Sequence, residues 1–140
     1  MSSPVSLQRL KQIATDACDS ALEKAESYNH SQTEQWNNAI IGKILSSLIS
    51  ESKPANAPAD AQAPFKFAVN STIIQHLSDP RPTGSDSQSS SDPAKVGRRG
   101  MHSASGAYWN TEKDGMWSFK YEGGEAKGMD VVVSVMWIAI

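Results

Sequence analysis

The sequence is poor in cysteine, in excess charge and in long apolar runs, and each of these deficits excludes a class of function. Its 140 residues include a single cysteine, Cys18, so the chain cannot form an internal disulfide or a thiolate metal cluster. Acidic and basic residues nearly balance, with a formal net charge of −2, so no basic field favours nucleic acid or a membrane surface as a partner. No apolar run is long enough to cross a bilayer, and residues 1–5 do not resemble a signal peptide. We therefore expect a soluble, cytosolic protein.

Side chains arranged for catalysis are also scarce. His30, His76 and His102 lie far apart, and none has a carboxylate or thiolate at the spacing of a metal ligand. Residues 102–106 lack the first glycine of a nucleophile elbow, and no helix is predicted after them. The glycine-rich stretch 123–128 precedes a strand, which indicates a tight turn and not a phosphate-binding loop. We expect a protein that is not an enzyme, with no catalytic residues, no metal site and no cofactor.

The first half of the chain predicts two helices. Ser3 can cap a helix whose first position is Pro4. Its apolar stripe, at spacings of three and four, consists of Leu10, Ile13, Ala14, Ala17, Ala21, Ala25 and Tyr28. Ser31 and Glu34 form a capping box for a second helix, which should end near residues 50–53. The apolar side of this helix consists of Trp36, Ile40, Ile44, Leu45 and Leu48.

The second half predicts four strands, at 65–77, 101–109, 116–122 and 129–140. Turn signals separate the last three, with Asp-Gly at 114–115 and Gly-Gly at 123–124 together with Gly128. The whole chain, 1–140, then forms a single α+β domain, with two N-terminal helices packed on a four-stranded antiparallel sheet. Two stretches are predicted to be flexible inserts, because they lack large apolar residues: 54–63 is rich in proline and alanine, and 78–99 in serine, aspartate, proline and glycine.

The last strand is apolar on both faces. Val131, Val133, Val135 and Trp137 share one face, while Val132, Met136 and Ile138 lie on the other. A strand with one face in water should alternate apolar and polar residues. Because two helices suffice to cover only one side, a second chain should cover the other, which indicates an obligate dimer. The residues that we expect at the dimer interface are Trp109, Trp117, Phe119, Val133 and Val135.

The predicted strand 101–109 is rich in small and polar residues. Glycine and serine weaken a strand and often mark a place where another backbone comes close. An edge strand of this kind can accept a partner peptide as an added strand. The alternative is a poorly packed edge strand that binds nothing.

Several segments, taken in order, resemble the Tctex-type dynein light chains. They are 31–38 (SQTEQWNN), 64–69 (PFKFAV), 100–105 (GMHSAS), Tyr108-Trp109 before an Asp-Gly turn, and the apolar final strand. The resemblance implies a homodimeric, non-catalytic subunit of the cytoplasmic dynein motor, located in the cytoplasm and on microtubules. It also implies that the second strand is exchanged between the two chains. Both inserts make their connections longer than is usual in the family.

The resemblance also implies a binding site and partners. A segment of the dynein intermediate chain adds beside the exchanged strand, and cargo proteins are further candidate partners. The peptide-binding residues are then His102, Ser103, Ala104, Ser105, Gly106, Ala107 and Tyr108, together with Trp36, Asn37 and Asn38 at the start of the second helix. An adaptor of the same fold that works apart from dynein, in a ciliary or signalling assembly, is the alternative.

Overall fold

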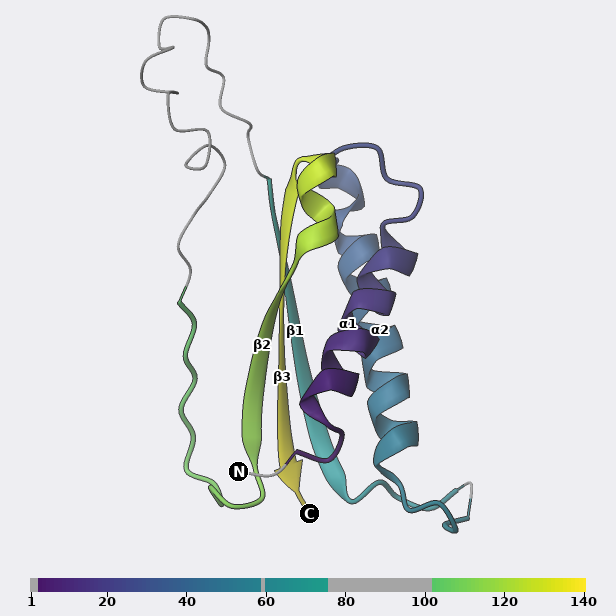
Figure 1. Cartoon of the computed structure of the whole chain (residues 1–140), viewed down its shortest axis with the longest axis vertical. Coiled ribbons are helices and arrows are strands. Elements are labelled where there is room, and N and C mark those ends of the chain that lie inside the picture. Colours follow the sequence, from purple (N-terminus) through teal and green to yellow (C-terminus); the bar gives the residue numbers. More distant parts are fainter. Residues whose placement is uncertain (1–2, 59, 76–101) are drawn as a thin grey trace, which may run out of the picture.

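The computed structural model describes residues 3–58, 60–75 and 102–140. Its helices are α1 (Leu7–Ala21) and α2 (Thr33–Ser52), with the short 3-10 helices η1 (His30–Gln32) and η5 (Glu122–Lys127). Its strands are β1 (Phe65–Gln75), β2 (Gly115–Tyr121) and β3 (Met129–Ala139). Two helices followed by antiparallel strands confirm the predicted α+β class (Figure 1). Within the described ranges, no helix is both long and apolar enough to span a membrane.

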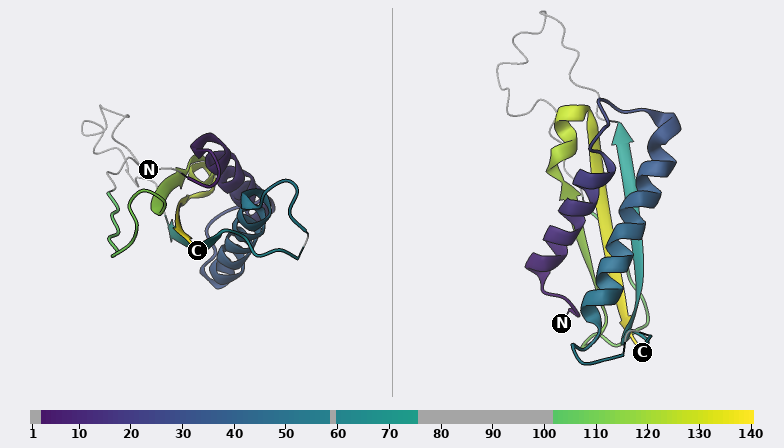
Figure 2. Two further views of the ribbon diagram at one scale, coloured as in Figure 1. Left: turned by 90° about the horizontal axis from the view of Figure 1, so that it is seen from below. Right: turned by 90° about the vertical axis from the view of Figure 1, so that its right-hand side faces the viewer.

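The three strands form an antiparallel sheet in the order β1-β3-β2. β3 lies in the centre, pairing with β1 from Phe65↔Ala139 to Gln75↔Met129 and with β2 from Gly115↔Trp137 to Tyr121↔Val131. Both helices cover the same face of the sheet, α2 over β1 and α1 nearer β2 (Figure 2). The result is one helical layer on one sheet layer.

The hydrophobic core lies between these two layers. The sheet contributes the alternate residues of β3 that the pattern predicted, Val131, Val133, Val135 and Trp137, and also Met129. The helices contribute Leu10, Ile13, Ala14, Ala17, Cys18, Trp36, Ile40, Ile44 and Leu48. Phe65, Phe67, Val69 and Ile73 of β1 pack against this core, as their alternation predicted.

The opposite face of the sheet has no helix over it in the described part of the chain (Figure 2). Its central rows pair Met116 with Met136 and Ser118 with Ser134, whose hydroxyl oxygens lie 3.1 Å apart. Val132 and Met136 are half-buried and Ile138 is exposed. We call this surface the open face. It remains available to a second chain.

The predicted fourth strand, 101–109, is not formed by the described residues of the single chain. Residues 102–109 run extended beside the sheet, but in the described ranges they pair with no strand (Figure 1). All of them except Trp109 are exposed. Their small side chains can bury little apolar area on this chain, so nothing offsets the entropy lost when a strand is ordered. Met101 lies outside the described residues.

Both helix starts differ from the prediction. α1 begins at Leu7 and not at Pro4, because the Ser6 hydroxyl accepts a hydrogen bond from the Arg9 backbone N–H at 3.1 Å. The capping box of Ser31 is also wrong, since Ser31 lies inside η1 and donates its N–H to the side chain of Asn29. α2 does end at Ser52, within the predicted interval.

The connections also depart from the predicted turns. The turn predicted at 123–124 is part of η5, and the chain enters β3 through Gly128, whose φ of 74° favours glycine. The insert 54–63 carries turn hydrogen bonds such as Ala57 N–H to Pro54 C=O at 3.1 Å. The insert 78–99 lies outside the described residues.

Candidate partner-binding surfaces

The extended segment 102–109 is anchored to the sheet at its carboxyl end. The backbone N–H of Asn110 donates to Oδ2 of Asp114 at 2.8 Å, and the N–H of Asp114 donates back to the Asn110 carbonyl at 2.8 Å. Oδ1 of Asp114 accepts from the N–H of Ala139, at the end of β3, at 2.7 Å. The Asp114 side chain is buried, so this turn is part of the folded body. The segment therefore leaves the sheet from a fixed point.

The first group of predicted peptide-binding residues is exposed together on this segment. It consists of His102, Ser103, Ala104, Ser105, Gly106, Ala107 and Tyr108. Tyr108 is as exposed as an isolated side chain, at 108%. The segment stands away from the sheet, on the side opposite the helices (Figures 1 and 2).

The second group lies at the start of α2, on the other side of the sheet. Trp36 is buried in the core, and Oδ1 of Asn37 accepts a hydrogen bond from the Ser71 hydroxyl of β1 at 2.8 Å. Asn38 is exposed and lines a shallow hollow of about 320 Å³ with Glu34 and Gln35. Because α2 packs on β1, a single chain does not bring the two groups together.

The residues expected at the dimer interface take part mainly in the core of the single chain. Val133 and Val135 are fully buried beneath the helices. Trp117 and Phe119 pack against the same core and stack on one another, with ring centroids 5.4 Å apart. Trp109 is half-buried beside the turn. The apolar side chains on the open face are instead Met116, Val132, Met136 and Ile138, with Ala68 and Ile74 of β1.

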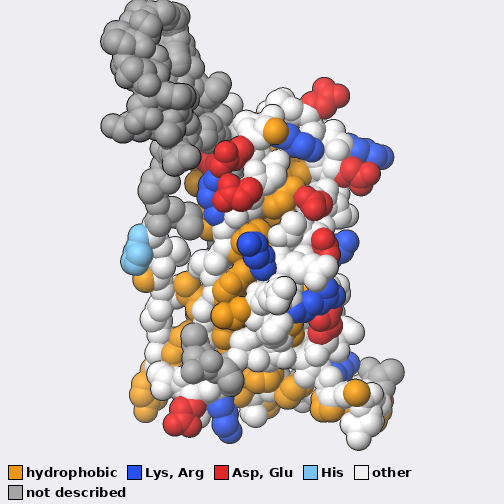
Figure 3. Space-filling model, in the orientation of Figure 1, with side chains coloured by type: hydrophobic (Ala, Val, Ile, Leu, Met, Phe, Trp, Pro, Cys, Tyr) orange, Lys and Arg blue, Asp and Glu red, His pale blue; other side chains and the backbone are white. Residues whose placement is uncertain are grey.

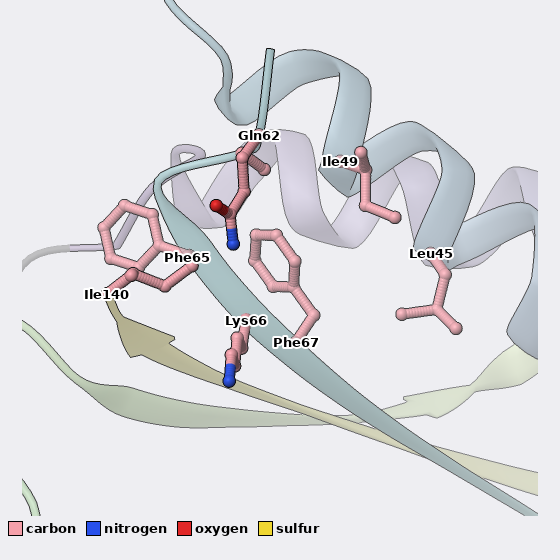
Figure 4. A pocket seen from close by; sticks show the side chains of 8 residues that line it. Leu45, Ile49, Gln62, Phe65, Lys66, Phe67 and Ile140 are labelled. Carbon is pink, nitrogen blue, oxygen red and sulfur yellow. The ribbon is translucent and has the colours of Figure 1, made fainter. Parts of the chain in front are cut away.

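A second apolar surface lies between α2 and β1, and the sequence reasoning missed it. A hollow of about 410 Å³ is lined by Leu45 and Ile49 of α2, Phe65, Lys66 and Phe67 of β1, and Gln62, Ala63 and Ile140. Figure 4 shows the Phe67 ring pointing toward α2 and Phe65 beside Ile140, while Lys66 points away. Only the folded chain brings these residues together, although the exposed apolar position at Ile49 was a signal.

The hollow borders an edge of the sheet. In the described residues β1 pairs with β3 alone, so the backbone groups along its other edge are not used by the sheet. Its 11 residues form a long edge, which is a template for pairing with another strand. An unpaired strand edge and an apolar hollow thus lie side by side.

Charged groups gather at one end of the open face. The ammonium of Lys120 lies 2.7 Å from Glu125, 3.5 Å from Asp130 and 3.7 Å from Glu122. The hydrogen bond to Glu125 raises the pKa of Lys120, so this ammonium stays charged. In Figure 3 hydrophobic side chains form a broken band along the strands, and charged ones cluster above it and over the helices. The open face is therefore apolar in the middle and charged toward η5.

The Cys18 thiol and the Tyr121 phenol are buried near η5 and are unreactive. Burial raises the pKa of the Cys18 thiol to about 12, which keeps it protonated and unreactive at neutral pH. Burial, and the hydrogen bond that its hydroxyl donates to Asp19, raise the pKa of Tyr121. Both groups act as packing residues, not as nucleophiles.

Comparison with known proteins gives the class of protein to which this fold and these surfaces belong. The sequence profile of the Tctex-1 family matches residues 4–138. The chain is 34% identical to a dynein light chain Tctex-type of Schizosaccharomyces pombe over 140 residues, the whole of both chains. It is 26% identical to a dynein light chain Tctex-type of Drosophila melanogaster over 114 residues, 81% of this chain and 73% of the relative.

A dynein light chain Tctex-type 3 of Homo sapiens is 24% identical over 123 residues, 88% of this chain and 78% of the relative. The chain therefore belongs to the Tctex-1 family, and the resemblance found in the sequence is confirmed.

Proposed function

We propose that this protein is a homodimeric, non-catalytic light chain of cytoplasmic dynein that binds a segment of the intermediate chain by β-strand addition. The observation that carries the proposal is the extended segment 102–108, which is exposed and pairs with no strand among the described residues. The 34% identity over the full length of a dynein light chain Tctex-type of Schizosaccharomyces pombe supports the motor assignment.

The dimer is supported by the open face of the sheet. Met116, Val132, Met136 and Ile138 occupy a surface that the two helices leave uncovered. Packing two such faces together removes this apolar area from water, and area of this kind is the main source of association energy. The buried residues Val133 and Val135 then act indirectly, by holding β3 in place, since the helices already cover them.

Strand exchange is supported by a complementary pair of features. In the described ranges, each chain has an extended segment, 102–109, that pairs with no strand, and a β1 edge that pairs with no other strand. In the exchanged dimer, the segment of one copy pairs with the β1 edge of the other. The outer edge of the exchanged segment then remains open to the intermediate-chain peptide.

The exchange also unites the two groups of predicted peptide-binding residues. Because α2 packs on β1, a strand added to the β1 edge of one copy lies next to that copy's α2. Residues 102–108 of one chain then line a groove with Asn38 of the other, whereas in one chain they lie on opposite sides of the sheet. The binding groove is therefore built from both copies.

The test is a pull-down of the tagged full chain from native cytosol. The expected result is co-purification of the dynein intermediate and heavy chains, with loss of both when Ser105→Pro removes a backbone donor in the segment. Glu112→Ala, in the exposed turn after the segment, is the matched control and should retain both chains. Capture of cargo proteins with no dynein chain would overturn the motor assignment and favour an adaptor that works apart from dynein.

A further inference from the structure

The hollow between α2 and β1 has no occupant among the described residues. Ile49 is 42% exposed and Ile140 is 66% exposed at its rim, and the rings of Phe65 and Phe67 form its floor. Large exposed apolar side chains that converge on a hollow of about 410 Å³ mark a place where another apolar group docks. Lys66 points away, so its charge does not oppose such a group.

Among the described residues, one large aromatic side chain is fully exposed. Tyr108 is fully exposed, whereas its neighbour Trp109 is half-buried. Isolated exposure is ordinary for a lysine but costly for an aromatic ring, because its apolar surface stays in water. An unfilled apolar hollow and an unpacked ring on one chain are complementary.

Tyr108 does not occupy the hollow of its own chain in the described structure. Its side chain is fully exposed, and its segment stands off the face of the sheet opposite the helices, whereas the hollow lies beside α2. The segment of a second copy can instead approach the β1 edge from outside.

We propose that the hollow formed by Leu45, Ile49, Phe65 and Phe67 is the receptor for Tyr108 of a second copy, so that each site is completed by the other chain. The proposal rests on the dimer of the proposed function, and it assigns the side chain that fixes the position of the exchanged segment. Backbone hydrogen bonds between the β1 edge and the added segment provide affinity. They do not fix which residues face one another, because such bonds are alike at every position. A ring that fits one hollow sets the register.

Neighbouring residues suit this role. Side chains alternate along an extended segment, so Ala104 and Gly106 share the side of Tyr108. Their small size lets the segment lie close to β1 and α2 until the ring is reached. The polar side chain of Gln62 lines the same hollow and offers a partner for the phenol hydroxyl, which buried tyrosines usually require.

The test is disulfide cross-linking between copies of the full chain. The only native cysteine, Cys18, is buried and protonated, so it should not form cross-links of its own. A chain with Tyr108→Cys is mixed with a chain carrying Ile49→Cys, and both positions are exposed, so neither change should harm the fold. Mild oxidation followed by a non-reducing denaturing gel should give a heterodimer band that disappears on reduction.

The matched control pairs Tyr108→Cys with Glu34→Cys, which is exposed at the other end of α2 and should give little cross-linked product. Sedimentation of each mixture before oxidation tests whether the dimer forms, separately from whether Tyr108 occupies the hollow. A dimer that forms the 108–49 cross-link supports it. A dimer in which 108–34 cross-links as strongly as 108–49 overturns the hollow as the receptor but leaves the dimer intact. A folded monomer overturns both.

A second variant tests the energetics. Tyr108→Ser should weaken dimerisation by roughly tenfold or more, as expected for an anchoring aromatic residue. Lys113→Ala, in the exposed turn after the segment, should leave dimerisation within about threefold of the wild type. Equal dimer affinity for Tyr108→Ser and the wild type would contradict the assignment.

Discussion

The carboxylate of Asp114 accepts a hydrogen bond from the backbone N–H of Ala139 at 2.7 Å, joining the turn before β2 to the last residue of β3. Its other oxygen accepts from the N–H of Asn110 at 2.8 Å. One buried side chain thus ties the end of the extended segment to the centre of the sheet. The position of the partner-binding segment depends on this one residue.

Asp114→Ala should lower the free energy of unfolding by about 1–3 kcal/mol, because two backbone N–H groups lose their acceptor in a buried position. Lys113→Ala, in the same turn but exposed, is the control and should change it by less than about 0.5 kcal/mol. Urea unfolding of both variants measures the difference. Equal midpoints for the two would show that water replaces the carboxylate without cost.

Two adjacent valines on β3 should respond to charge in opposite ways. Val133→Asp places an unpaired carboxylate in the core and should leave the chain unfolded or insoluble, since the cost of several kcal/mol approaches the whole stability of a small domain. Val132→Asp faces the open side and should give a folded chain that no longer dimerises. Circular dichroism and sedimentation separate these outcomes. A dimeric Val132→Asp would show that the open face is not the interface.

Peptide binding should depend on the backbone of the extended segment. Ser105→Pro removes one N–H, and Gly106→Trp adds a bulky group on the side of Tyr108. Ser105→Pro should abolish binding of an intermediate-chain peptide if the Ser105 amide faces the ligand. Lys113→Ala should leave the affinity unchanged. The measurement is calorimetric titration of the peptide, with dimerisation followed in parallel. Wild-type affinity in both segment variants, as intact dimers, would move the binding site elsewhere.

Stability should fall at alkaline pH through Cys18. Burial raises the pKa of this thiol from 9.0 to about 12, so the folded state holds a proton that the unfolded chain releases. The stabilisation is therefore complete below about pH 9 and is lost as the pH rises toward 12, by on the order of 1 kcal/mol per pH unit. Urea unfolding between pH 8 and 10 should show a steeper decline for the native chain than for Cys18→Ala. Equal slopes would contradict the assignment.

Periodicity predicted most of the folded body. The alternation of Val131, Val133 and Val135 placed β3 in the core, and the spacing of Ile40, Ile44 and Leu48 defined the buried side of α2. These patterns succeed because burial of one face is decided within the element itself. Helix starts were less predictable, because Ser3, Ser6 and Ser31 can all cap a helix and only tertiary packing selects among them.

The sequence predicted which residues form the candidate site, but not where they lie in the folded chain. Small residues marked 102–108 as a segment for close backbone approach, yet whether it pairs depends on an edge that this chain does not bring to it. The hollow of Ile49, Phe65 and Phe67 depends on how α2 lies over β1. Neither fact is written in a local pattern.

The central place of β3 also constrains how the protein is made. β1 and β2 leave the ribosome before β3, yet each pairs only with β3 in the described sheet. Until β3 emerges, β1 and β2 lack the strand with which they form backbone hydrogen bonds. The apolar surfaces of α1 and α2 also lack the sheet on which they pack. Strand pairings between residues far apart in the sequence slow folding and prolong the exposure of unpaired, aggregation-prone strand edges. A delay between the emergence of β2 and that of β3 from the ribosome should therefore lengthen the interval in which these surfaces are exposed.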